Sequence, residues 1–202
     1  VSQRKKIYKT AHAEAMAKLA HIDMMTNLAN RRGCERAFDE IREEDKVFGI
    51  ICIDINFLKL TNDKYGHQEG DKLLVDFAHM LSDACTDESY TVGRMGGDEF
   101  TVIMPEADVI SVETLLHNIE VKKDEVNVDR KPLPLSFAYG YCISDDAAIN
   151  DLNDAGDLVE RVYHIADERM YENKKKMKAR RDDLVDIMKS EYMININDKA
   201  SK

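Results

Sequence analysis

The chain has 202 residues, a length that suits one substantial domain with short appendages better than two full domains. Hydrophobic residues make up 44% and charged residues 34%, so the chain can bury a core and is not expected to be broadly disordered. A formal net charge of -10 argues against nucleic acid as a partner, because binding to its backbone needs clustered positive charge, so a phosphate ligand must be held locally.

An apolar stripe predicts a helix over residues 3–22, within a linker that we assign to residues 1–22. Members of the stripe recur every three or four residues, and they are Ile7, Ala11, Ala15, Leu19 and Ile22. A stripe this narrow fits the end of a two-stranded coiled coil and fits equally a helix that lies on its own domain. Because the first residue is Val and no signal peptide is visible, we expect a fragment of a longer protein whose upstream sensory domain is missing.

The rest of the chain alternates helical and strand-like patterns. In chain order these are a helix through Ala37 and Ile41, a strand over 46–55, a helix over 70–85, strands over 90–94 and 99–104, a helix over 109–121, a strand over 133–144 and a helix from about 157 to 178. This mixture predicts an α+β sandwich in which helices flank a mostly antiparallel central sheet. We place the main domain at residues 23–180 and a helical tail, with no functional interpretation, at 181–202.

Cysteine usage and hydropathy indicate the setting in which the chain works. The four cysteines are scattered without a CxxC pair, which is typical of a reducing compartment such as the cytoplasm. The longest apolar stretch, residues 47–55, is far shorter than the roughly 20 residues that a membrane helix needs. We therefore expect no direct membrane contact from this chain, although the full-length protein could carry an anchor upstream.

Two glycines join the strands at 90–94 and 99–104 within the heptapeptide RMGGDEF, residues 94–100. A Gly-Gly pair between two strand-like runs predicts a hairpin with a type I′ turn, because both central residues of that turn need positive φ. Asp98 and Glu99 follow at once, where the second strand leaves the turn. Taken alone, such acids are more simply interpreted as solvated turn residues.

A second acid, Asp54, favours a functional interpretation of the turn. It interrupts the apolar strand over residues 46–55 near its end, where a buried charge is costly unless it is paired or bound to a cation. If the hairpin packs beside this strand, Asp54 and Asp98 converge. Their oxygens then form a site suited to Mg²⁺, which prefers carboxylates and ligand phosphates.

These residues belong to a set of motifs that resembles a known family, the GGDEF domains, most of which are diguanylate cyclases. The resemblance covers about residues 21–180. Four separated motifs carry it in the family's order: DMMTNLANRR at 23–32, DINFLKLTNDKYGHQEGDKLL at 54–74, RMGGDEF at 94–100 and ADERMYENKKKMK at 166–178. Four such motifs in order are much more specific than one short match.

The resemblance implies a fold similar to the polymerase palm and the nucleotide cyclases, and a reaction that joins two GTP molecules into cyclic di-GMP with release of two pyrophosphates. Each subunit would hold one GTP, so the active species would be a homodimer with facing sites. By the same resemblance Asp54, Asp98 and the backbone carbonyl of Ile55 would bind Mg²⁺ or Mn²⁺. Glu99 would serve as a further ligand or as the base that takes the 3′-hydroxyl proton, and both roles stay open.

The resemblance also implies a guanine site built from Asn62 and Asp71, with His67 in a supporting role. A carboxylate can accept from the N1–H and the exocyclic amine of guanine, and an amide can pair with its other edge. Adenine would leave that acceptor unpaired, which favours GTP over ATP. A purely structural role remains open for both residues, with Asn62 as a loop or cap residue and Asp71 near a helix N-terminus.

Phosphate-binding residues are implied on both sides of the hairpin. Phe57, Leu58 and Lys59 follow the metal strand, and Lys59 matches a lysine that stabilises the transition state. Lys174 and Lys178 lie one turn apart on the last helix, hence on one face, and match the family's phosphate-binding Lys and Arg. For Lys178 a solvated helix end is an equally good interpretation, because lysine lacks the two-pronged phosphate contact of arginine.

Several positions depart from the family pattern. Asn56 replaces the usual second Asp of the metal strand, Leu58 replaces Phe, and Met177 replaces the Gly before the last phosphate residue. These changes put the rate in doubt more than the identity. We therefore favour an active enzyme, with a non-catalytic module that binds GTP or a partner and transmits a signal as the alternative.

Regulation is expected to differ as well. Many members bind their product at an Arg-x-x-Asp site just before the hairpin, where this chain has residues 87–90, Asp-Glu-Ser-Tyr. Neither the Arg nor the Asp of that site is present, and these acids would repel an anionic dinucleotide. We predict no product-inhibition site on this surface.

Overall fold

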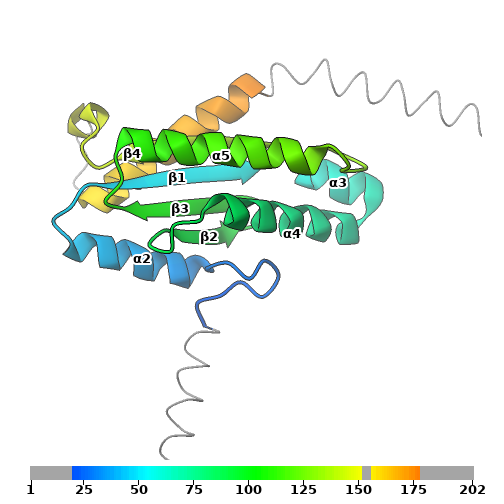
Figure 1. Cartoon of the computed structure of the whole chain (residues 1–202), viewed down its shortest axis with the longest axis horizontal. Helices are drawn as coiled ribbons and strands as arrows, with labels where there is room; N and C mark the ends of the chain where they lie inside the picture. The colour runs from blue at the N-terminus through cyan, green and yellow to red at the C-terminus, as the bar shows by residue number, and fades with distance from the viewer. Residues whose placement is uncertain (1–19, 152–155, 178–202) are drawn as a thin grey trace, which may run out of the picture.

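The computed structural model describes residues 20–151 and 156–177. The elements in chain order are α2 (Arg31–Glu43), β1 (Phe48–Ile55), α3 (Leu58–Tyr65), α4 (His67–Ala84), β2 (Thr91–Gly96), β3 (Glu99–Pro105), α5 (Val109–Asn127), β4 (Phe137–Ile143), the 3-10 helix η1 (Ala147–Asp151) and a helix over residues 158–177. Figure 1 shows α3 beyond the end of the β1 arrow, next to α4. The end of β1 and the start of α3 are therefore close in space.

The four described strands form one antiparallel sheet in the order β2-β3-β1-β4, which confirms the predicted α+β fold. β1 lies in the middle and is buried along its whole length. Strand residues alternate between the two faces of a sheet. Ile51, Ile53 and Ile55 accordingly pack with α4 and α5, whereas Ile50 and Cys52 pack with α2 and the 158–177 helix.

Three sequence predictions need correction. The helical pattern does not reach residue 22, because residues 20 and 21 form a turn and Ile22 pairs with Ala29 in a β-bridge. α3 was not predicted, since Thr61 is its one buried residue and it has no apolar stripe. α5 continues to Asn127, beyond the predicted end at residue 121. The rest of the N-terminal helix and the tail over 181–202 lie outside the described residues.

The polar segment before α2 is an ordered loop rather than a loose junction. The amide of Asp23 donates to the carbonyl of Leu28 at 2.8 Å, and Asn27 has a positive φ of 58°. Backbone hydrogen bonds from Ala29 to Val92 and from Arg94 to Ala29 attach this loop, residues 22–30, to β2. These bonds hold the loop through which the chain enters the domain next to β2, the strand that leads into the glycine turn.

Two further expectations concern cysteines and the membrane. Cys34, Cys52, Cys85 and Cys142 are all free thiols in the structure. Across residues 20–151 and 156–177, the structure contains no helix with both the length and the apolar character that crossing a membrane requires.

Candidate active site

The glycine turn differs from the predicted type I′ geometry. The pairing of β2 with β3 shifts between Arg94 and Gly96, so Gly96 pairs with Glu99 and the central turn residues become Gly97 and Asp98. Gly97 has a φ of 53°, whereas Asp98 is not among the described residues with positive φ. A type I′ turn needs positive φ at both central positions, so this turn is not type I′. The bulge moved the turn by one residue, which the sequence pattern could not show.

Asp54 and Glu99 are paired across β1 and β3. Residues directly opposite in an antiparallel pair project from the same face of the sheet, so both carboxylates lie on the face covered by the 158–177 helix. Asp54 is 5% exposed, whereas Glu99 is exposed. Asp98 is joined to the end of β1 by its carbonyl, which accepts from the amide of Ile55 at 2.9 Å. The register thus makes Glu99, rather than Asp98, the acid opposite Asp54.

Negative charge is concentrated around Glu99. Partial burial of its side chain, followed by the charges of Asp98, Asp167 and Asp54, raises the pKa of Glu99, and the nearby Arg31 offsets this in part. Asp167 comes from the 158–177 helix and was not predicted as a site residue. The motif ADERMYENKKKMK contains it, but no chemical pattern assigned it a role.

Lys174 forms an ion pair with the buried carboxylate of Asp54. Its Nζ lies 2.6 Å from Oδ2 of Asp54, and the two side chains are 39% and 7% exposed. The helix that carries Lys174 can lie directly on β4 because Gly140 has no side chain, since a Cβ there would be 2.1 Å from the backbone nitrogen of Met170. This packing brings Lys174, the predicted phosphate-binding residue, into contact with Asp54, the predicted metal ligand.

The start of α3 has an unusual backbone. Phe57 caps the helix with a positive φ of 69°, a conformation that is rare for a bulky residue and is often found at functional sites. Its carbonyl accepts from both the amide and the hydroxyl of Thr61. This conformation turns the chain from the end of β1 into α3, which carries Leu58 and Lys59.

Asn62 of α3 lies against Gly70 of α4. A Cβ at Gly70 would be 1.9 Å from Oδ1 of Asn62, so any larger residue here would force the Asn62 side chain to move. Gly70 precedes Asp71, and the close approach therefore brings the two predicted guanine-binding positions together. Sequence reasoning missed Gly70, although a glycine inside a helical pattern is a known sign of close packing.

Three of the remaining predicted substrate-binding residues lie on the surface. Lys59, His67 and Asp71 are exposed. His67 and Asp71 are four residues apart on α4 and share one face of that helix. Lys178 lies outside the described residues.

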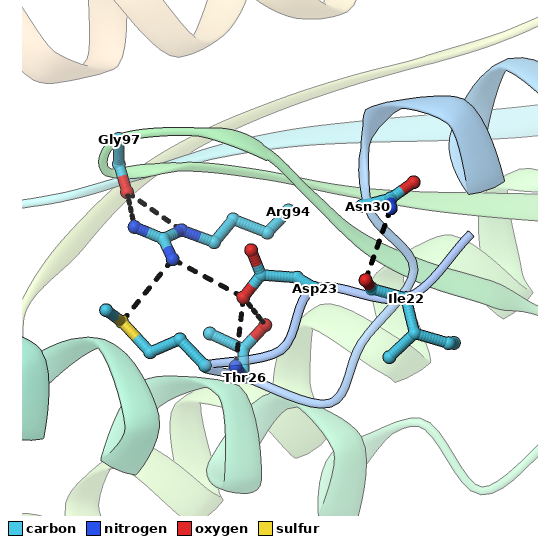
Figure 2. A network of polar contacts seen from close by, with 7 residues as sticks. Ile22, Asp23, Thr26, Asn30, Arg94 and Gly97 are labelled. Carbon is cyan, nitrogen blue, oxygen red and sulfur yellow. Dashed lines mark hydrogen bonds and ion pairs between the residues drawn. The ribbon is translucent and has the colours of Figure 1, made fainter. Parts of the chain in front are cut away.

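A network around Arg94 connects the loop over 22–30 to the glycine turn (Figure 2). The Nε and Nη2 atoms of Arg94 donate to the carbonyl of Gly97 at 3.0 and 2.7 Å. Its Nη1 atom lies 3.4 Å from Oδ1 of Asp23 and 3.5 Å from Sδ of Met25. The same Asp23 oxygen accepts from the amide and the hydroxyl of Thr26. Arg94 thus joins the conformation of the turn to that of the loop.

The donor set fits a magnesium-type ion that is shared with a ligand. Within residues 20–151 and 156–177, no group of three or more His, Cys, Asp and Glu side chains is arranged to hold a metal by itself. Mg²⁺ is usually bound through one or two carboxylates together with substrate phosphates. A buried carboxylate at Asp54, with Asp98 beside the strand end, matches that incomplete kind of site.

The departures from the family pattern also have defined surroundings. Asn56 is buried, and its Nδ2 donates to Oγ of Ser136 at 3.1 Å and lies 4.0 Å from Sδ of Met177. Its Oδ1 is buried without a hydrogen-bond partner. In the segment before the hairpin, the amide and hydroxyl of Ser89 both donate to Asp87, which closes a compact turn.

The chain is similar to known proteins that share one family description. The family model described as "Diguanylate cyclase, GGDEF domain" matches residues 20–180. A protein named diguanylate cyclase A from Treponema denticola is 31% identical over 135 residues, which cover 65% of this chain and 34% of that relative. An uncharacterised protein of Streptomyces ambofaciens is 29% identical over 67% of this chain and 72% of its own length.

A solved structure supports the fold. The coiled coil and GGDEF domain of DgcB from Caulobacter crescentus, in complex with c-di-GMP, superposes with a TM-score of 0.71 at 24% identity and covers 87% of this chain and 91% of that one. The chain spans less than half the length of several curated relatives that it matches.

Proposed function

Because the chain belongs to the GGDEF domain family, we propose that it is a diguanylate cyclase that condenses two GTP molecules into cyclic di-GMP and releases two pyrophosphates. One observation carries the proposal. A buried carboxylate, Asp54, ends the central strand opposite Glu99 and beside a glycine turn, which is an arrangement suited to an anionic ligand held through a cation. The relative from Treponema denticola, named as a diguanylate cyclase, supports the same activity.

Asp54, Asp98 and the carbonyl of Ile55 would hold the divalent cation, Mg²⁺ or Mn²⁺. When bound, such a cation neutralises the triphosphate and polarises the α-phosphate. Gly96 and Gly97 leave room for backbone amides to approach phosphate at the turn. Glu99 is the exposed acid on the same face as Asp54, which suits it to accept the proton of the 3′-hydroxyl while that oxygen attacks the α-phosphorus.

Substrate recognition would come from α3, α4 and the last helix. Asn62 and Asp71 would pair with guanine, and His67 on the Asp71 face of α4 would support them. Lys59 would stabilise the charge that develops on phosphate, and Lys174 would bind the triphosphate. Phe57 and Leu58 would line the floor of the substrate site. Lys178 is proposed as a phosphate-binding residue from the sequence resemblance alone.

The reaction needs two bound GTP molecules, so we propose that a homodimer with facing sites is the active species. An upstream sensory domain would control this association through residues 1–22. Incubation with GTP and Mg²⁺ or Mn²⁺, followed by mass analysis, tests the proposal, with EDTA and ATP as controls. We expect cyclic di-GMP from GTP in the presence of the metal, and no such product with ATP or with EDTA. GTP that binds without conversion would support the non-catalytic alternative.

A further inference from the structure

The contact between Lys174 and Asp54 places a cation where the proposed metal would act. The ammonium is 2.6 Å from the carboxylate, and the Asp54 side chain is only 7% exposed. A carboxylate this buried requires a positive partner, because burial strongly disfavours its charged form. In the structure Lys174 meets that requirement from a helix on the same face of the sheet.

We infer that Lys174 is a built-in counter-ion that competes with the divalent cation for Asp54 and leaves it for the triphosphate when nucleotide arrives. The inference rests on the proposed function, since it concerns the same site. It adds that Lys174 has two alternative partners. The ion pair must be broken or weakened for Asp54 to become a ligand, so the metal alone binds poorly.

Lys174 is suited to change partners. Its side chain is 39% exposed, and a lysine ammonium on a four-carbon stem can swing without moving the backbone. Asp54 is fixed in the ladder of β1 between β3 and β4 and cannot follow. Nucleotide phosphates offer the released ammonium a new anionic partner, and so metal and nucleotide binding are coupled through Lys174.

The neighbouring Lys175 provides a matched control. Its Nζ lies 4.1 Å from the centre of the Tyr171 ring, on the same helix. Lys175→Gln removes the same charge from the same helix without touching the Asp54 ion pair. A general change in electrostatic potential would therefore affect both variants, whereas loss of the competing ion pair affects only Lys174→Gln.

The test measures binding of Mn²⁺ alone, from the loss of the free-ion electron paramagnetic resonance signal, to the wild type, Lys174→Gln, Lys174→Arg and Lys175→Gln. We expect Lys174→Gln to bind Mn²⁺ about tenfold more tightly than the wild type, because a competing cation is removed. Lys174→Arg and Lys175→Gln should stay close to the wild type. Equal Mn²⁺ affinity in folded Lys174→Gln and wild type would overturn the inference.

A measurement on the wild type decides the matter if Lys174→Gln does not fold. Acylation of lysines by an N-hydroxysuccinimide ester, read by mass spectrometry, should become faster at Lys174 and remain unchanged at Lys175 when Mn²⁺ is bound. An unchanged rate at Lys174 contradicts the inference only. Lack of Mn²⁺ binding in every variant, even with a non-hydrolysable GTP analogue, contradicts the proposed metal site and the inference with it.

Discussion

Asp54 lies directly opposite Glu99 in the ladder between β1 and β3, so one face of the sheet presents a buried and an exposed carboxylate side by side. The buried member is fixed by two neighbouring strands, and the exposed member is free to meet a ligand. Under the proposed function, the buried acid would hold the cation and the exposed acid would accept the proton. The proposal therefore gives a reason for an acid inside the central strand.

Gly70→Ala should raise the KM for GTP. In an exposed helix this change would normally stabilise the protein, but here the new Cβ would be 1.9 Å from Oδ1 of Asn62. Overpacking of this kind costs about 1–3 kcal/mol and would push the Asn62 side chain out of place. Urea unfolding and steady-state kinetics check the two effects. In the double variant with Asn62→Ala, stability should recover while GTP affinity does not, and unchanged stability in Gly70→Ala would contradict the packing argument.

Arg94→Lys should lower kcat while leaving the fold intact. Lysine cannot give the two parallel donors that hold the carbonyl of Gly97, so the turn that carries Asp98 loses its fixed position. Misplacement by about 1 Å can cost roughly 100-fold in rate. Arg36→Lys is the control, because Arg36 pairs with Glu40 on the exposed surface. Equal turnover in the two variants would count against a positioning role for Arg94.

The contribution of Asp23 to stability should depend on pH. Burial alone would raise its pKa, but hydrogen bonds from Thr26 and the charge of Arg94 outweigh burial and hold the pKa of Asp23 below its usual value of 3.8. A lowered pKa means that the stabilisation is complete above the unfolded pKa and is lost as the pH falls through the folded one.

The Asp23→Asn variant tests the direction of this pH dependence of stability. Its loss in free energy of unfolding, relative to the wild type, should be largest at pH 7 and should shrink below about pH 4. Denaturant unfolding from pH 7 to pH 3 gives the comparison, and Asp45→Asn serves as an exposed control. A penalty that is the same at both ends of this range would show that the charge of Asp23 is not what matters.

Cyclic di-GMP should not inhibit the proposed cyclase activity through the surface before the hairpin. Asp87 and Ser89 close a turn there, and the acids in this segment oppose an anionic dinucleotide. Initial rates at increasing product concentration, with Glu88→Arg as a second variant, would test this. An inhibition constant in the low micromolar range that maps to residues 87–90 would refute the prediction.

The sequence predicted the fold well because its signals were local. The continuous apolar run of β1 and the apolar stripe of α4 follow directly from which faces are buried, both faces for β1 and one for α4. α3 lacked such a stripe, so nothing marked it as a helix. The turn type was wrong because the bulge before Gly96 depends on pairing with β3, which no local pattern encodes.

The candidate site was only partly predictable, because much of it depends on contacts between residues far apart in the sequence. Asp54 could be identified because an acid inside an apolar strand is exceptional. The pairing of Asp54 with Glu99 depends on register, and its contact with Lys174 depends on how the last helix packs across Gly140. Asp167 carried no distinguishing signal, since an acid on an amphipathic helix is usually solvated.

The rate of cyclic di-GMP formation from GTP in the wild type and in Asp54→Ala tests the central claim most directly. The account predicts that the wild type forms cyclic di-GMP with Mg²⁺ or Mn²⁺, and that its specific rate rises with protein concentration as dimers form. Asp54→Ala should lose at least about 100-fold of this rate, and Asp45→Ala should lose little. No cyclic di-GMP from the wild type at high protein concentration, or full activity in Asp54→Ala, would contradict the account.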